Sequence, residues 1–195
     1  MKSTVKSLVL FTCVGLFSIS GQAQLKLPGN SALASDLKKV IADYPSHFDH
    51  IRGELIAEHP QSTEYKCNFS VNGAEESSIT RYSSKKIIYS WEAVLLTTEN
   101  FEKARQKFKS VFNQLNNLVA DIGDTKNVKF RGQYESPDEA QKFTSVVFQA
   151  EPVTETSRKV KMEISLQFHA PMEWKLKVLV YDQEREDEER GSRVD

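Results

Sequence analysis

The sequence has few of the residues that mark several protein classes. Its 195 residues include only 2 cysteines, 8 glycines and 6 prolines, which is too little glycine and proline for a fibrous or low-complexity chain. Lys and Arg number 26 against 27 Asp and Glu, a formal net charge of -1 at pH 7, so the chain lacks the positive charge of a nucleic-acid-binding protein. A hydrophobic share of 39% is typical of a globular protein, and this length predicts one domain.

Long hydrophobic runs are also missing. The most apolar segment, residues 8–17 (LVLFTCVGLF), follows Lys2 and Lys6 and is too short to span a bilayer, which requires roughly 20 residues. Gly21-Gln22-Ala23 then places small residues at the two positions that a signal peptidase reads. We therefore predict that residues 1–23 are a signal peptide cleaved before Gln24. The mature protein is then periplasmic or extracellular, with no transmembrane segment.

Removal of this segment would leave one cysteine, Cys67. A single thiol cannot form an internal disulfide, so an apolar core has to stabilise the domain. Cys67 alternates with Tyr65 and Phe69, and this pattern predicts a buried side chain in a strand rather than a nucleophile, which needs a base and an exposed, electropositive setting.

The C-terminal end differs from the rest of the chain. Residues 182–195 (DQEREDEERGSRVD) hold seven acidic residues and three arginines, and no apolar residue precedes Val194. Such a segment cannot bury enough surface to offset its chain entropy. We predict a disordered charged tail over 182–195, after a single α+β domain over 24–181.

Two segments of that domain have helical periodicity. The first has apolar residues at helical spacing and ends at Pro45: Leu33, Leu37, Val40, Ile41 and Tyr44. The second has a wide apolar stripe from Phe101 to Ile122, with Thr98 or Asn100 as its N-terminal cap and Gly123 after its end. Each helix should bury one face.

Strand patterns fill most of the remaining domain. Residues 65–71 alternate, and Asn72-Gly73 predicts a hairpin turn into 79–82. Residues 87–96 are apolar on both faces, as in a central strand. The other predicted strands are 51–57, 128–134, 143–150, 160–168 and 174–180. Together these segments predict an antiparallel sheet of about seven to eight strands, with the two main helices on one face.

The two halves of the domain have the same order of elements. Each helix is followed by four strand-like segments, and Arg52-Gly53 in the first half matches Arg131-Gly132 in the second. This order is typical of a tandem duplication, with repeats over 31–97 and 98–181. The alternative is a single α+β domain in which the order recurs by chance.

Several short motifs between Phe48 and Leu118 carry a resemblance. They are Arg52-Gly53-Glu54-Leu55, Thr63-Glu64-Tyr65, Asn72-Gly73-Ala74 and Tyr89-Ser90-Trp91-Glu92, followed by the helix around 104–115. This region resembles small exported α+β proteins of unknown function from Bacteroidota-type bacteria. The resemblance implies a fold and export, and it transfers no catalytic residue. In layout, the paired units also resemble the β-lactamase inhibitor protein, whose concave sheet holds an enzyme.

One face of the predicted sheet is polar. Alternate residues of three later strands point away from the predicted helices, and these are the candidate residues for binding a ligand or partner: Arg131, Lys161, Glu163, Gln167, His169, Lys175 and Lys177. The partner would be an unidentified protein or small molecule. The alternative is a face that is merely solvated.

Sequence motifs for catalysis are absent. The glycines occur singly, so G-x-G-x-x-G, G-K-[ST] and G-x-S-x-G do not appear. No cofactor is therefore predicted. Glu92 interrupts an apolar strand beside Trp91, and it is either an outward-facing strand residue or a buried acid with a raised pKa.

The histidines provide an alternative. His47, Asp49, His50 and His59 could in principle hold zinc or copper, and a small metal-dependent hydrolase would use them. Their spacing argues against it, because Pro45 and the turn that follows it interrupt any shared helix face. The leading hypothesis is therefore an exported, non-enzymatic binding protein that uses the polar sheet face. No metal ligands are assigned.

Overall fold

We analysed a computed structural model of the chain, which describes residues 31–83 and 86–184. Two long helices and a nine-stranded antiparallel sheet make up an α+β fold. The predicted signal peptide and most of the predicted tail lie outside the described residues. In chain order the elements are α1 (Ala32–Asp43), the 3₁₀ turn η1 (Tyr44–Ser46), β1 (Arg52–His59), β2 (Ser62–Cys67), β3 (Glu76–Ser83), β4 (Ile87–Thr98), α2 (Phe101–Leu115), β5 (Val119–Ile122), β6 (Thr125–Arg131), the 3₁₀ turn η2 (Glu139–Gln141), β7 (Phe143–Glu151), α3 (Glu155–Lys159), β8 (Val160–His169) and β9 (Glu173–Asp182).

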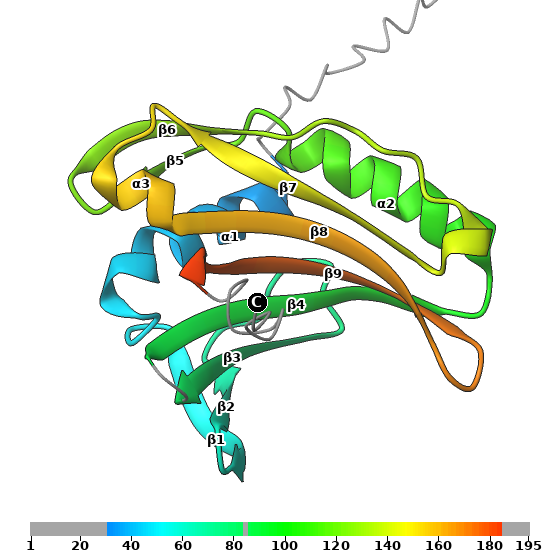
Figure 1. Cartoon of the computed structure of the whole chain (residues 1–195), viewed down its shortest axis with the longest axis horizontal. Coiled ribbons are helices and arrows are strands. Elements are labelled where there is room, and N and C mark those ends of the chain that lie inside the picture. The colour runs from blue at the N-terminus through cyan, green and yellow to red at the C-terminus, as the bar shows by residue number, and fades with distance from the viewer. Residues whose placement is uncertain (1–30, 84–85, 185–195) are drawn as a thin grey trace, which may run out of the picture.

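The strands form one sheet in the order β1-β2-β3-β4-β9-β8-β7-β6-β5. The last strand of each half, β4 and β9, pair antiparallel at its centre, with Trp91 opposite Val180. The first half therefore fills one side of this central pair and the second half fills the other. Figure 1 shows β4, β9 and β8 side by side across the middle of the molecule.

Alternate strand residues and both long helices share one apolar core. Met162, Ile164 and Leu166 of β8 belong to it together with Leu37 of α1 and Phe108 of α2. Helix α2 packs on β4, β8 and β9, whereas α1 packs mainly on β5 and touches α2. Because strand side chains alternate, the residues between these core positions point to the opposite side of the sheet. We call that side the open face.

The second helix ends earlier than its apolar stripe predicts. It stops at Leu115, and Val119–Ile122 forms β5, a strand that the periodicity does not predict. Asn116 caps the helix through a bond from its N–H to the Phe112 carbonyl, and Asn117 has a φ of 71°. Asparagine is a weak helix former that tolerates left-handed backbone, so this pair ends the helix. In β5, Ala120 and Ile122 are buried because strand side chains alternate. Their spacing also fits a continued helical stripe, and this is why the sequence predicts a longer helix.

The connection from β2 to β3 is also longer than predicted. Strand β2 ends at Cys67, and the eight residues from Asn68 to Glu75 form a loop instead of a two-residue hairpin. Gly73 still makes a turn, with a φ of 78°. Asp36 holds this loop to α1, because its carboxylate accepts hydrogen bonds from Asn72 N at 2.9 Å and Asn72 Nδ2 at 2.6 Å. Asp36 is 3% exposed, although it lies off the apolar stripe of α1.

The first residues of the predicted tail still belong to the ordered chain. Asp182 ends β9 and accepts a 2.7 Å hydrogen bond from the Tyr44 hydroxyl. Glu184 forms an ion pair with Lys86 at 2.8 Å. The ordered domain therefore continues past Tyr181, because Asp182 and Glu184 contact Tyr44 and Lys86.

Both Arg-Gly pairs lie at close approaches between neighbouring strands. A Cβ on Gly132 would lie 2.8 Å from Val146 Cγ1, and one on Gly53 would lie 3.0 Å from the carbonyl oxygen of Lys66. Sterics alone thus account for both glycines. The tandem duplication stays a prediction.

Candidate functional site

The candidate residues lie together on the open face. Arg131 ends β6, and the others alternate with core residues along β8 and β9: Lys161, Glu163, Gln167, His169, Lys175 and Lys177. Cross-strand pairing puts Lys175 opposite Gln167. The sequence therefore predicted correctly which residues share this side of the sheet.

Hydrogen bonds and ion pairs order part of this face. The Tyr181 hydroxyl donates to Glu163 Oε2 at 2.8 Å, and Lys177 Nζ lies 3.0 Å from Glu92 Oε1. Glu92 is half-buried and points to the open face, so the outward-facing interpretation of this residue is the correct one. The Lys177–Glu92 pair crosses the central β4–β9 seam and ties the two halves together.

The second half of the open face carries basic side chains that its acidic side chains do not all pair with. Arg131 pairs with Glu151 at 3.3 Å, whereas Lys161 donates to the neutral amide of Gln149 at 3.0 Å. Within residues 31–83 and 86–184, neither Lys161 nor Lys175 forms an ion pair. These two lysines give this part of the surface an attraction for anionic groups.

The centre of the open face is less polar than predicted. Val94, Leu179 and Tyr181 are buried there, at 4%, 8% and 4% exposure. Leu179 lies between two acids across the strands, opposite Glu92 on one side and Glu163 on the other. The sequence does carry a signal for this, because residues 178–181 (VLVY) are apolar at consecutive positions. Such a run indicates a strand buried on both faces.

At the β8–β9 hairpin the face becomes more exposed. Gln167 is exposed, and Phe143 on β7 directly opposite it is 49% exposed. His169 is half-buried, and its Nε2 has no hydrogen-bond partner among the described residues. Aromatic residues are enriched at protein interfaces, so the exposed Phe143 ring suits a contact surface.

On the first half, the open face meets a pocket of about 580 Å³. Strands β2, β3 and β4 contribute polar side chains to its wall, and the β2–β3 loop contributes much of the rest. Its lining includes Glu64, Lys66, Ser78 and Glu92 from the strands and Phe69 and Val71 from the loop. A volume of this size suits a small organic molecule. The sequence pattern does not predict this pocket, because the loop forms one of its walls.

Cys67 also lines this pocket. Its side chain is half-buried and packs against the core, and it forms no disulfide. Cys67 is therefore less buried than the alternation predicts, because β2 lies next to the edge strand β1.

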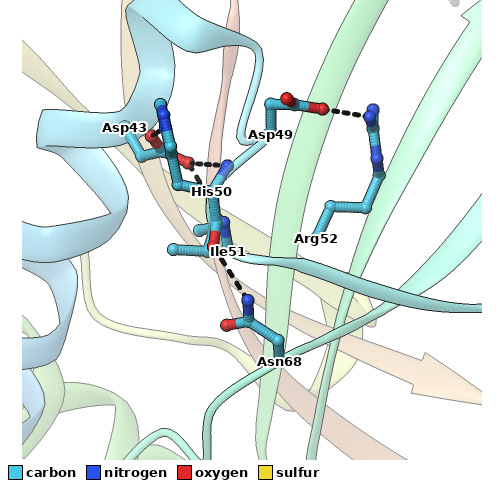
Figure 2. A network of polar contacts seen from close by, with 6 residues as sticks. All are labelled: Asp43, Asp49, His50, Ile51, Arg52 and Asn68. Atoms are coloured by element: carbon cyan, nitrogen blue, oxygen red, sulfur yellow. Dashed lines mark hydrogen bonds and ion pairs between the residues drawn. The ribbon is translucent and has the colours of Figure 1, made fainter.

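The predicted histidine cluster instead organises the turn after α1. The Asp43 carboxylate accepts hydrogen bonds from the backbone N–H groups of His50 at 3.1 Å and Ile51 at 3.3 Å (Figure 2). His50 Nδ1 lies 2.5 Å from the other carboxylate oxygen, and this hydrogen bond, with the charge of Asp43, raises the pKa of His50. These contacts hold a turn in which the fully buried Phe48 has a φ of 59°. A left-handed backbone is costly for so bulky a residue.

The other members of that cluster point to different partners. The His47 ring stacks on Tyr89 with centroids 5.1 Å apart, and Asp49 pairs with Arg52. His59 ends β1 at the hairpin with Ser62. Within the described residues, no group of three or more His, Cys, Asp or Glu side chains is placed to hold a metal ion. The geometry therefore gives the hydrolase alternative no support.

Comparisons with known proteins add no further constraint. No protein-family model, curated protein or solved structure matches this chain. Among the described residues, no helix is long and apolar enough to cross a membrane.

Proposed function

We propose that the protein is an exported, non-enzymatic binding protein whose polar open face contacts a partner. The observation that carries this proposal is the juxtaposition of charged side chains on β6, β8 and β9. All seven candidate residues lie on the side of the sheet away from the apolar core. Export rests on the predicted signal peptide.

The face has the organisation of a protein-binding surface. Its middle is held rigid by the Tyr181–Glu163 hydrogen bond and the Lys177–Glu92 ion pair. Side chains that are ordered before binding lose less entropy when a partner arrives. Around that middle, Lys175 and Gln167 are available for new hydrogen bonds, and Phe143 offers an exposed ring.

Charge indicates which kind of partner fits. Lys161 and Lys175 have no acidic partner in the described part of the chain, and the Arg131 side chain is about half exposed beside Glu151. A protein surface rich in Asp and Glu complements this region and would be steered toward it at low salt. The proposed partner is therefore an acidic protein surface.

Site-specific photo-crosslinking in the exporting cell tests this proposal. A photoreactive residue at Gln167 or Lys175 would lie on the proposed interface, whereas the same residue at Lys103 or Lys109 would lie on the exposed side of α2. We expect a defined crosslinked band from the first pair only. Equal crosslinking from both pairs, or none from the open face, would contradict the proposal.

A further inference from the structure

Part of the open face is buried, although both long helices pack on the core side of the sheet. Four hydrophobic side chains of β4 and β9 are at most 8% exposed yet lie outside the apolar core: Ile88, Val94, Leu179 and Tyr181. We call these four residues the apolar strip. Ser90, opposite Tyr181, is 3% exposed. An antiparallel sheet face that nothing covers is normally solvated, so this burial points to a cover.

We propose that the cover is the C-terminal segment of this chain, residues 185–195, which lies outside the described ranges. The segment folds back from the end of β9 across the apolar strip and toward Lys161. In this position it occupies part of the surface that an acidic partner would use, and it therefore competes with that partner. The competition rests on the proposed function, whereas the contact within the chain does not.

The segment begins beside the apolar strip. Tyr181 of the strip is followed by Asp182, the last residue of β9, and Glu184 forms an ion pair with Lys86 just before β4. The Asp182 carboxylate also accepts a hydrogen bond from Glu184 N at 2.9 Å, and such a contact turns the chain where the strand ends. Residue 185 is therefore placed next to the strip with no linker to span.

The segment is also long enough to cross the face. Residues 185–195 reach up to about 36 Å when extended, whereas β9 from Lys175 to Asp182 spans about 23 Å. A tethered segment has an effective concentration on the order of mM at a nearby surface. A contact that would be too weak between separate molecules is therefore populated here.

Charge and composition of the segment suit this surface. Residues 186–189 are four consecutive acids (EDEE), and Val194 is the segment's only apolar residue. Lys161 lies opposite Tyr181 and donates to the neutral amide of Gln149. Within residues 31–83 and 86–184, Lys161 forms no ion pair. The acids thus complement a lysine beside the strip, and Val194 can add an apolar contact.

Intramolecular photo-crosslinking of the purified protein, as recovered from the exporting cell, tests the contact. A photoreactive residue replaces Ser192, and mass spectrometry of the peptides maps where it attaches. We expect attachment to β4, β8 and β9 within single chains, with a yield that does not fall on dilution. The exposed side of α2 around Lys103 and Lys109 is also basic and is the internal control, where we expect few crosslinks.

Charge variants of the full chain assign the attraction. The segment variant carries Glu186→Gln, Asp187→Asn, Glu188→Gln and Glu189→Gln. The control variant makes the same charge change at exposed positions elsewhere: Glu99→Gln, Asp124→Asn, Glu135→Gln and Glu139→Gln. We expect the open-face crosslink to fall by about fivefold in the segment variant and to stay unchanged in the control. Raising NaCl from about 0.1 M to about 1 M should also lower it, because the Debye length shrinks from about 10 Å to about 3 Å.

Three results would overturn the proposal. They are crosslinks to α2 as frequent as those to the open face, open-face crosslinks that join two copies and vanish on dilution, and equal yields from the segment and control variants. No partner is present in this experiment. Its failure is therefore distinguishable from failure of the partner crosslinking through Gln167 and Lys175, which tests the proposed function.

Discussion

At the scale of single residues, the Asp43 carboxylate holds the turn that follows α1. Its side chain is 10% exposed and accepts hydrogen bonds from two backbone N–H groups and from the His50 ring. Asp43→Ala would leave the N–H groups of His50 and Ile51 without their partner. We expect the free energy of unfolding in urea to fall by about 3 kcal/mol.

Asp49→Ala is the matched control for that measurement. Asp49 lies in the same turn, but its side chain is 62% exposed and pairs with Arg52. An exposed ion pair contributes about 0.5 kcal/mol or less. Equal losses in the two variants would show that Asp43 does not hold the turn.

His50 makes the stability of the protein depend on pH. Its hydrogen bond to Asp43 and the charge of Asp43 raise its pKa in the folded state above the ordinary value of 6.5. A raised histidine pKa stabilises the fold fully below the unfolded-state pKa, and this stabilisation is lost as pH rises through the folded-state pKa. The stability advantage of the wild type over His50→Gln should therefore be larger at about pH 5.5 than at about pH 9. A constant or reversed difference would contradict the assigned contact.

Sequence reasoning placed the residues of the open face but missed the buried acids of α1. Asp36 and Asp43 are polar residues in a helix, so periodicity assigns them to its solvent side or says nothing of them. Their burial depends on loops that return from positions 50 and 72 to meet them. No local pattern encodes those long-range contacts.

At the scale of elements, α2 gives the most direct test of the fold. Phe108 is fully buried and Phe112 is 6% exposed, and the two face the core on successive turns. Phe108→Ala should lower the free energy of unfolding by about 3 to 5 kcal/mol, since it opens a cavity in a packed core. Lys109→Ala changes an exposed neighbour and should have little effect, about 0.5 kcal/mol or less. Similar small losses in both variants would mean that the helix faces the other way.

Elements with one clear period were predicted well, and those with mixed signals were not. The alternation along β8 and β9 and the stripe of α1 correspond to observed elements. The segment 116–122 was assigned to the helix because Leu118 and Ile122 continue its spacing, although Asn116 and Asn117 interrupt the backbone there. The β2–β3 loop was shortened for a similar reason, since Val71 looks like a strand residue but is buried within a loop.

At the scale of the whole molecule, the sequence predicts processing as well as folding. If residues 1–23 are a signal peptide, the protein recovered from the periplasmic or secreted fraction should begin at Gln24. Intact-mass spectrometry of that fraction measures this directly. Recovery of a chain that still begins at Met1, or of protein confined to the cytoplasm, would contradict export.

The arrangement of the two halves was only partly predictable. Composition and periodicity indicated an antiparallel α+β domain with helices on its core side. The pairing of β4 with β9 joins segments far apart in the sequence, and strand patterns alone do not specify partners. The pocket is not predictable for the same reason, because its walls come from four strands and a loop whose positions are fixed only by the assembled sheet.

The most direct test of the central claim is an affinity capture from native envelope and secreted fractions with charge-reversed baits. One bait carries Arg131→Glu, Lys161→Glu and Lys175→Glu on the open face. The control bait carries Lys103→Glu, Lys107→Glu and Lys109→Glu on α2, the same change of charge away from that face. The account predicts a partner held by the wild type and the α2 variant and lost by the open-face variant. A partner lost only by the α2 variant, or held equally by all three baits, would contradict the claim that the open face is the binding surface.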